Sequence, residues 1–136
     1  MAIVGFDYNK ISVEKNEGQS GKISVANSVN IKRVERNDIS LGKTKQSGLK
    51  FVFEYSSIYN PNYAKILLGG TVLVLQEEKT VQEVLDAWAK DKKIKKEILE
   101  GVINTILTRC NIQSLILSNA ANLPPPVPMP KVRSNP

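Results

Sequence analysis

The hydrophobic periodicity of this chain changes once, between residues 76 and 80, and this change constrains the fold more than any other feature. Before it, apolar and polar residues alternate in four segments that are rich in β-branched and aromatic residues, a pattern typical of strands. After it, apolar residues recur at spacings of three and four, which predicts amphipathic helices. The sequence therefore predicts an α+β fold, in which a four-stranded antiparallel sheet is followed by two C-terminal helices and an extended proline-rich tail.

Turns and irregularities are predicted from the residues between and within the strands. The expected strands are residues 3–15, 22–34, 49–59 and 64–76. Residues 37–48 are polar and predict a loop, and Asn60-Pro61 predicts a turn. The alternation slips at residues 26–28, which predicts a β-bulge, and Gly69-Gly70 indicates a bulge or a close approach of another backbone.

The first helix is expected to follow the fourth strand closely. Thr80 and Glu83 have the spacing of a capping box, in which each side chain bonds a backbone N–H, so this helix should begin at Thr80. The lysine-rich segment KDKKIKK, residues 90–96, should end it. Together the two helices are expected to occupy residues 80–119.

The second helix and the tail complete the expected fold. An apolar stripe from Ile94 to Cys110 is wide, as expected for a helix that lies on a sheet or in an interface. The pattern is interrupted near Asn111 and continues to Asn119, where the helix should end or kink. The tail, residues 123–130, has five prolines in the seven positions from Pro124 and must be extended, because proline supplies no backbone donor.

The length and composition indicate one compact domain, since the chain has 136 residues, of which 41% are apolar and 24% charged. We expect this domain to span residues 1–130, followed by a loose tail at residues 131–136. The chain has no His, which excludes imidazole as a base, proton shuttle or metal ligand. No phosphate-binding, nucleophile-elbow or metal-ligand motif is present. The sequence therefore predicts a protein that is not an enzyme and has no catalytic residue, cofactor or metal site.

The single cysteine and the apolar segments indicate where in the cell the protein is expected. Cys110 can form no internal disulfide, and it lies on the apolar stripe, which predicts a buried structural thiol. Residues 1–10 lack the pattern of a signal peptide, and the longest apolar segment, residues 66–75, has about half the length needed to cross a bilayer. We therefore expect a cytoplasmic protein without a membrane span.

The net charge of +6, from 19 Lys and Arg against 13 Asp and Glu, leaves binding of a polyanion open. The dense group of cations is the lysine-rich segment between the helices, which is either a solvated turn or a contact for phosphate or a partner. Its lysines are Lys90, Lys92, Lys93, Lys95 and Lys96. A basic nucleic-acid or ribosome-binding protein would use these lysines together with Lys43 and Lys45 of the polar loop.

Two groups of aromatic residues are candidates for binding. Phe51, Phe53 and Tyr55 alternate on the third strand, where core packing and a base-stacking platform are competing interpretations. Large amphipathic residues at the hairpin end, with the tryptophan and the apolar part of the tail, either line a groove or pack in the interior. The candidate groove walls are Tyr55, Tyr59, Tyr63, Trp88, Leu123 and Val127.

The end of the chain resembles that of the SecB-type export chaperones. The resemblance is carried by Leu115-Ile116-Leu117 and Asn122-Leu123-Pro124-Pro125-Pro126-Val127, and the order of elements over residues 3–130 is similar to that family's. In general appearance the chain resembles an archaeal branch more than the bacterial members. The resemblance implies a dimer or a dimer of dimers, whose long apolar grooves hold unfolded polypeptides in an extended state without nucleotide. Typical members are acidic, so the charge of +6 leaves a ribosome-associated or RNA-facing role open.

The leading prediction is a non-enzymatic, SecB-like chaperone or polypeptide-binding protein that forms a homo-oligomer and holds extended or unfolded segments in an apolar groove. One alternative is a small basic nucleic-acid or ribosome-associated protein. Another is a structural oligomer subunit whose interface is the apolar stripe of the second helix. Salt separates the first two, because phosphate binding weakens steeply as salt rises, whereas apolar binding changes little or strengthens.

Overall fold

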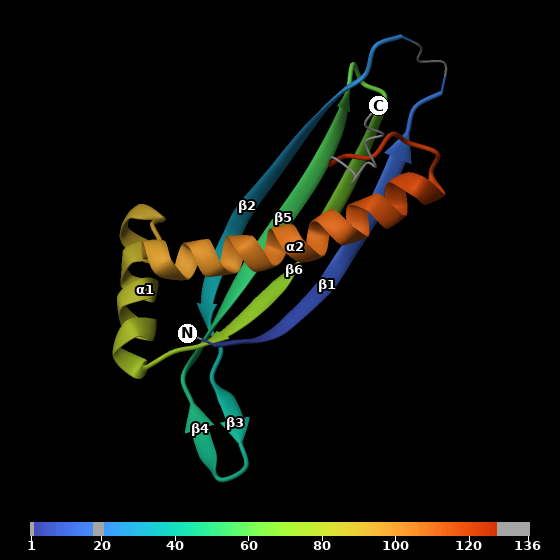
Figure 1. Cartoon of the computed structure of the whole chain (residues 1–136). Coiled ribbons are helices and arrows are strands. Elements are labelled where there is room, and N and C mark those ends of the chain that lie inside the picture. Colours follow the sequence, from blue (N-terminus) through green and yellow to red (C-terminus); the bar gives the residue numbers. More distant parts are fainter. Residues whose placement is uncertain (1, 18–20, 128–136) are drawn as a thin grey trace, which may run out of the picture.

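The computed structural model describes residues 2–17 and 21–127. Four long antiparallel strands form one sheet in the spatial order β1-β6-β5-β2. These strands are β1 (Ala2–Lys15), β2 (Ser24–Arg36), β5 (Gly48–Asn60) and β6 (Ala64–Leu75). Two helices follow, α1 (Glu78–Asp91) and α2 (Lys96–Ala120), and α2 crosses one face of the sheet (Figure 1). The predicted α+β class, with a four-stranded antiparallel sheet before two helices, is confirmed.

The core lies between α2 and the face of the sheet that this helix covers. Phe51, Phe53 and Tyr55 of β5 have at most 1% of their surface exposed, which confirms core packing and excludes a base-stacking platform at these residues. The buried side chains of α2 recur at every fourth position, along one ridge of the helix. They are Ile98, Val102, Ile106, Cys110, Ser114 and Ser118. The chain's own sheet thus occupies this stripe, which is not free to serve as a subunit interface.

The segment between β2 and β5 differs from the prediction. The expected loop at residues 37–48 contains a small hairpin, β3 (Ile39–Leu41) and β4 (Thr44–Gln46), which projects from one end of the main sheet (Figure 1). Its turn uses Gly42 at a φ of 65°, a conformation that glycine adopts without a steric cost. Each strand has three residues, which is too few for an alternating pattern to be recognised in the sequence.

The predicted bulge at residues 26–28 is wrong. Residues 24–31 of β2 pair with β5 without interruption, and the register shifts between Ile31 and Arg33 instead. The alternation slips at Asn27 because this side chain lies on the covered face, where its Oδ1 accepts a hydrogen bond of 2.8 Å from Ser57. A polar residue at an inward-facing position interrupts the apolar alternation in the sequence, although the register of the strand does not change there.

The close approach expected at Gly69-Gly70 is confirmed. A bulge on β1 faces these two glycines across the strand pair. At Gly70, an added Cβ would overlap the backbone carbonyl oxygen of Asp7 and lie 3.1 Å from a ring carbon of Phe53. At Gly69, the nearest atom to an added Cβ would be 3.4 Å away, which is an ordinary contact. The backbone approach therefore requires glycine at position 70 and tolerates a side chain at position 69.

Helix α1 begins at Glu78, two residues before the predicted start at Thr80, and its N-cap makes no side-chain cap bond, so the predicted capping box is wrong. Arg36 of β2 donates two hydrogen bonds to the carboxylate of Glu78, at 2.5 and 2.9 Å, and the hydroxyl of Ser47 donates a third at 2.5 Å. These bonds lower the pKa of Glu78 from 4.5 to about 2. The start of α1 is thus set by a tertiary contact and not by a local cap.

We expect this contact to make the stability of the fold depend on acidic pH. Because the pKa of Glu78 is lower in the folded chain than in the unfolded chain, its stabilising contribution is present above pH 4.5 and is lost as the pH falls toward about 2. Glu78→Gln should remove this contribution. The urea midpoints of the parent and the variant should therefore differ at neutral pH, and the difference should shrink as the pH falls from 4.5 toward about 2. A gap between the two midpoints that stays constant with pH would contradict the assignment.

Helix α2 runs unbroken through Asn111, so the interrupted pattern there marks no kink. The side chain of Asn111 accepts a hydrogen bond from β5 instead. The helix ends in a Schellman motif, in which the N–H of Leu123 bonds the carbonyl of Ser118 at 2.8 Å. Asn122 supplies the left-handed residue of this motif, with a φ of 56°. The motif turns the chain back toward the sheet.

The described part of the proline tail packs on the covered face of the sheet and contains no helix or strand, as predicted (Figure 1). The hydroxyl of Tyr59 donates a hydrogen bond of 2.6 Å to the carbonyl of Pro124. The amide of Asn27 donates another, of 2.9 Å, to the carbonyl of Pro126. Residues 128–136, which include the expected loose C-terminal end, lie outside the described residues.

Candidate functional site

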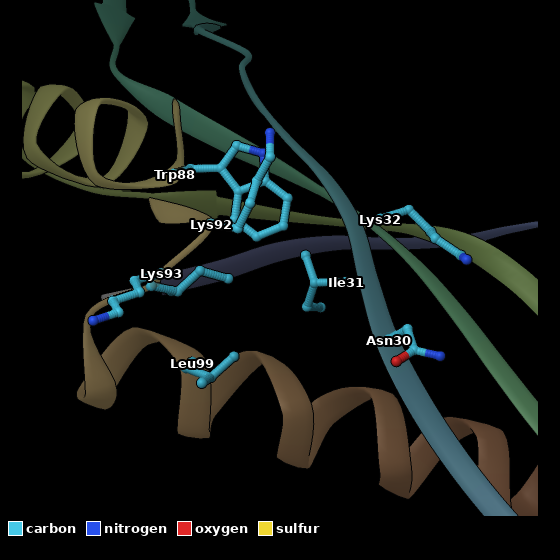
Figure 2. A pocket seen from close by; sticks show the side chains of 8 residues that line it. Asn30, Ile31, Lys32, Trp88, Lys92, Lys93 and Leu99 are labelled. Carbon is cyan, nitrogen blue, oxygen red and sulfur yellow. The ribbon is translucent and has the colours of Figure 1, made fainter. Parts of the chain in front are cut away.

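An open groove of about 770 Å³ lies where the turn between α1 and α2 meets β2 (Figure 2). Trp88 of α1, Ile31 of β2 and Leu99 of α2 face the same space, and Ile94 of the turn completes the apolar lining. The polar lining residues are Asn30, Lys32, Lys92 and Lys93. Because β2 is an edge strand of the sheet, the groove lies beside a strand whose outer edge has no partner among the described strands.

The floor of this groove and its charged neighbour lie on opposite faces of β2. Ile31 is half-buried and packs against the core. The next residue, Lys32, extends toward the uncovered face of the sheet, where its Nζ lies 3.9 Å from the carboxylate of Glu54. Successive side chains of a strand point to opposite faces of the sheet. Ile31 therefore lies at the floor of the groove, and the adjacent ammonium is directed away from it.

The turn between the helices places a cation directly on the aromatic wall. Lys92 adopts a left-handed conformation with a φ of 57°, and its N–H bonds the carbonyl of Trp88 at 3.0 Å, which ends α1. The Nζ of Lys92 lies 5.1 Å from the centre of a Trp88 ring, within the range of a cation–π interaction. One tryptophan thus forms an apolar wall and also holds an ammonium group at the rim (Figure 2).

The five lysines of the turn are divided between different surfaces. Lys92 and Lys93 line the groove, and within residues 2–17 and 21–127 neither has a carboxylate within 4.0 Å. Lys95 lines two smaller hollows beside α1 and α2, and Lys96 pairs with an acidic residue one turn further along α2 at 4.0 Å. Lys90 is exposed in the last turn of α1 and does not line the groove. The structure therefore brings two of the five to the candidate site.

The six candidate groove walls also lie in different places. Trp88 lines the groove. Three others are buried in the core in this structure, namely Tyr55, Tyr59 and Leu123. Tyr63 is half-buried in the β5–β6 turn, at the end of the sheet away from α1 (Figure 1), and Val127 is half-buried in the tail. The structure thus does not bring the hairpin-end aromatic residues together with Trp88.

The polar groups that lie in a row under the tail all have hydrogen-bond partners. The hydroxyl of Ser57 donates to Oδ1 of Asn27, which leaves the Asn27 amide N–H to donate to Pro126. Burial raises the pKa of Tyr59 to about 12, so its hydroxyl stays protonated and donates to Pro124. Every buried side-chain nitrogen and oxygen in the described part of the chain has a hydrogen-bond partner. This row stabilises the tail and leaves no polar group free for a ligand.

The environment of the single thiol confirms that it is buried. Cys110 faces the sheet from α2, and its burial raises the pKa of the thiol to about 11. Burial is also the main cause of the raised pKa of the neighbouring Tyr8 hydroxyl. A thiol that stays protonated at neutral pH is a poor nucleophile. Cys110 therefore contributes to packing in this structure.

Sequence reasoning did not single out Ile31, Ile94 or Leu99 as binding residues. Each belongs to a strand or helix pattern that by itself predicts only core packing. The one feature of the sequence that bears on the groove is the short connection between the helices, which holds the end of α1 close to the start of α2. That signal indicates that the two helices meet, but it does not indicate that β2 completes the groove.

Fold and groove together define an α+β protein with an open groove, apolar at its floor and cationic at its rim, beside an edge strand. No protein-family model matches the chain, and no curated protein or solved structure is significantly similar to it. The resemblance to SecB-type chaperones therefore stays a prediction from the sequence. Among the described helices, none is long and apolar enough to cross a membrane. In the same part of the chain, no three His, Cys, Asp or Glu side chains are grouped to hold a metal ion.

Proposed function

We propose that this protein is a non-enzymatic, SecB-like polypeptide-binding protein that holds extended or unfolded segments beside β2. The observation that supports this most strongly is the groove formed by Trp88, Ile31 and Leu99 at the edge of the sheet. Concave sites with an apolar and aromatic lining are the usual sites of ligand binding in proteins. The groove is open to solvent, which suits an extended chain better than a small molecule that must be enclosed.

The edge strand supplies the second part of the proposed interaction. Among the described strands β2 pairs only with β5, so its outer backbone N–H and C=O groups are available to an added strand. Main-chain hydrogen bonds to an added strand do not depend on the sequence that is bound. The pairing of β2 with β5 is uninterrupted up to Ile31 and shifts register after it, so we place the added segment beside residues 24–30, with a side chain in the groove. Such binding would tolerate many sequences, as a chaperone requires.

The nucleic-acid alternative has less support. A track for phosphates requires several cations on one surface, whereas two of the five turn lysines line the groove. On the β3–β4 hairpin, Lys45 lies 4.0 Å from Asp38, which reduces its free charge. The homo-oligomer implied by the resemblance stays a prediction, and Ile112 and Ile116 of α2, each 56% exposed, are available for such a contact.

Affinity measured against salt tests the proposed function. A fluorescently labelled unfolded polypeptide and a labelled single-stranded RNA of similar length would be titrated with the protein, and binding followed by anisotropy. Between about 50 and 500 mM salt, the polypeptide affinity should change by less than about threefold, because apolar contacts and backbone hydrogen bonds are not weakened by screening. RNA that binds more tightly than the polypeptide at low salt, and is released at high salt, would overturn the proposal.

A further inference from the structure

Two lysines at the rim of the groove give it a positive charge in addition to its apolar lining. Lys92 and Lys93 are exposed at its rim, and no carboxylate among the described residues lies within 4.0 Å of either ammonium. The third lysine of the lining, Lys32, is paired with Glu54 toward the uncovered face of the sheet. Two cations at one end of the groove therefore give it a positive potential, Lys92 on the aromatic wall and Lys93 directed away from it (Figure 2).

We infer that the groove selects extended segments in which apolar side chains alternate with carboxylates. This inference rests on the proposed function and names the class of polypeptide that is bound. Lys92 is already held over Trp88, so a carboxylate that pairs with its ammonium meets a group whose position is fixed. An apolar side chain next to that carboxylate would pack between Trp88 and Leu99.

The same charges should reject basic segments. A Lys or Arg side chain entering the groove would be brought close to Lys92 and Lys93, where no carboxylate is within ion-pair distance to offset the repulsion. Like charges brought together at an interface reduce affinity for the wrong partner. Selectivity therefore has an attractive part, for Asp and Glu, and a repulsive part, against Lys and Arg.

A phosphate backbone fits the groove less well than an acidic polypeptide. Four of the eight side chains that line the groove are apolar, and the two ammonium groups at its rim diverge, since Lys92 lies along Trp88 whereas Lys93 points away from it (Figure 2). A nucleic-acid strand would place its charged backbone against this apolar lining. An extended peptide can instead direct apolar side chains to the floor and carboxylates to the rim, because successive side chains of a strand point to opposite sides.

Three labelled peptides that share their apolar residues test the inference. In these peptides Leu and Phe alternate with Glu, with Gln or with Lys. At low salt the Glu peptide should bind about three to ten times more tightly than the Gln peptide, and the Lys peptide should bind most weakly. The double variant Lys92→Gln, Lys93→Gln should bind the Glu and Gln peptides equally. The control variant Lys43→Gln, Lys45→Gln, on the β3–β4 hairpin, should keep the full preference.

The outcomes separate this inference from the proposed function. Equal binding of the Glu and Gln peptides to the parent protein would overturn the selectivity and leave polypeptide binding intact. Failure of all three peptides to bind would overturn both. Displacement of the Glu peptide by a single-stranded RNA that binds more tightly would show that Lys92 and Lys93 bind phosphate groups, and it would overturn the inference. Circular dichroism shows whether the double variant is folded, and Lys93→Gln alone, which leaves the end of α1 intact, should still reduce the preference.

Discussion

Gly70→Ala should destabilise the fold by at least about 3 kcal/mol, the largest effect that we expect from adding one methyl group. The added Cβ would overlap the carbonyl oxygen of Asp7, which belongs to the backbone of the neighbouring strand, and would also press on the ring of Phe53. Neither group can rotate away, because the carbonyl is part of the β1–β6 ladder and Phe53 is buried. Urea unfolding followed by circular dichroism measures the loss.

Gly69→Ala is the matched control, because it adds the same methyl group to the adjacent residue of the same strand. Its Cβ would meet the Cβ of Lys10 at 3.4 Å, an ordinary contact, so we expect a change within about 1 kcal/mol. A similar loss in both variants would show that β6 does not tolerate a side chain at either position. That result would contradict the close backbone approach assigned to Gly70 alone.

Trp88→Ala should weaken the binding of an unfolded polypeptide at least about tenfold, the second large effect that we expect. The indole is the largest apolar surface of the groove and also holds Lys92, so its loss removes both the wall and the support of the cation. Buried or half-buried tryptophans at the centre of an interface commonly dominate its binding energy. Anisotropy of a labelled polypeptide measures the change in affinity.

Ile58→Ala is the control for this variant, because Ile58 is a large apolar residue, 39% exposed, that lies outside the groove on β5. Its removal should leave polypeptide affinity unchanged. Trp88 also packs against the core, so the thermal unfolding of both variants would be compared with that of the parent. Loss of binding in the Ile58 variant, with binding retained in the Trp88 variant, would move the site to the uncovered face of the sheet.

The long elements of this fold could be predicted from the sequence because their hydrophobic patterns extend over ten or more residues. The alternation in β5 and the apolar stripe of α2 each continue long enough to identify the element and its buried face, and β6, apolar on both faces, is identified as a central or doubly covered strand. Shorter features could not be predicted in this way. The β3–β4 hairpin has three residues in each strand, and the start of α1 is set by Arg36, which is distant in the sequence.

The candidate site could be predicted only in part, because the sequence does not show what covers a side chain. Tyr55 and Tyr59 have the size and polarity of groove residues, yet α2 and the tail bury both and accept their hydroxyl hydrogen bonds. Trp88 was predicted as a wall and lines the groove. Ile31 faces the same groove by the ordinary alternation of β2, but the sequence does not show that Trp88 and Leu99 lie opposite it.

The emission of Trp88 tests most directly whether polypeptide binds in the groove, because this is the only tryptophan of the chain and it forms the groove wall. The protein would be titrated with an unfolded polypeptide that lacks tryptophan, and both the emission and its quenching by acrylamide would be recorded. Binding in the groove should shift the emission to shorter wavelength and reduce the quenching, since the bound segment excludes water from the indole. Binding that is seen by anisotropy but leaves the emission and quenching of Trp88 unchanged would contradict this site.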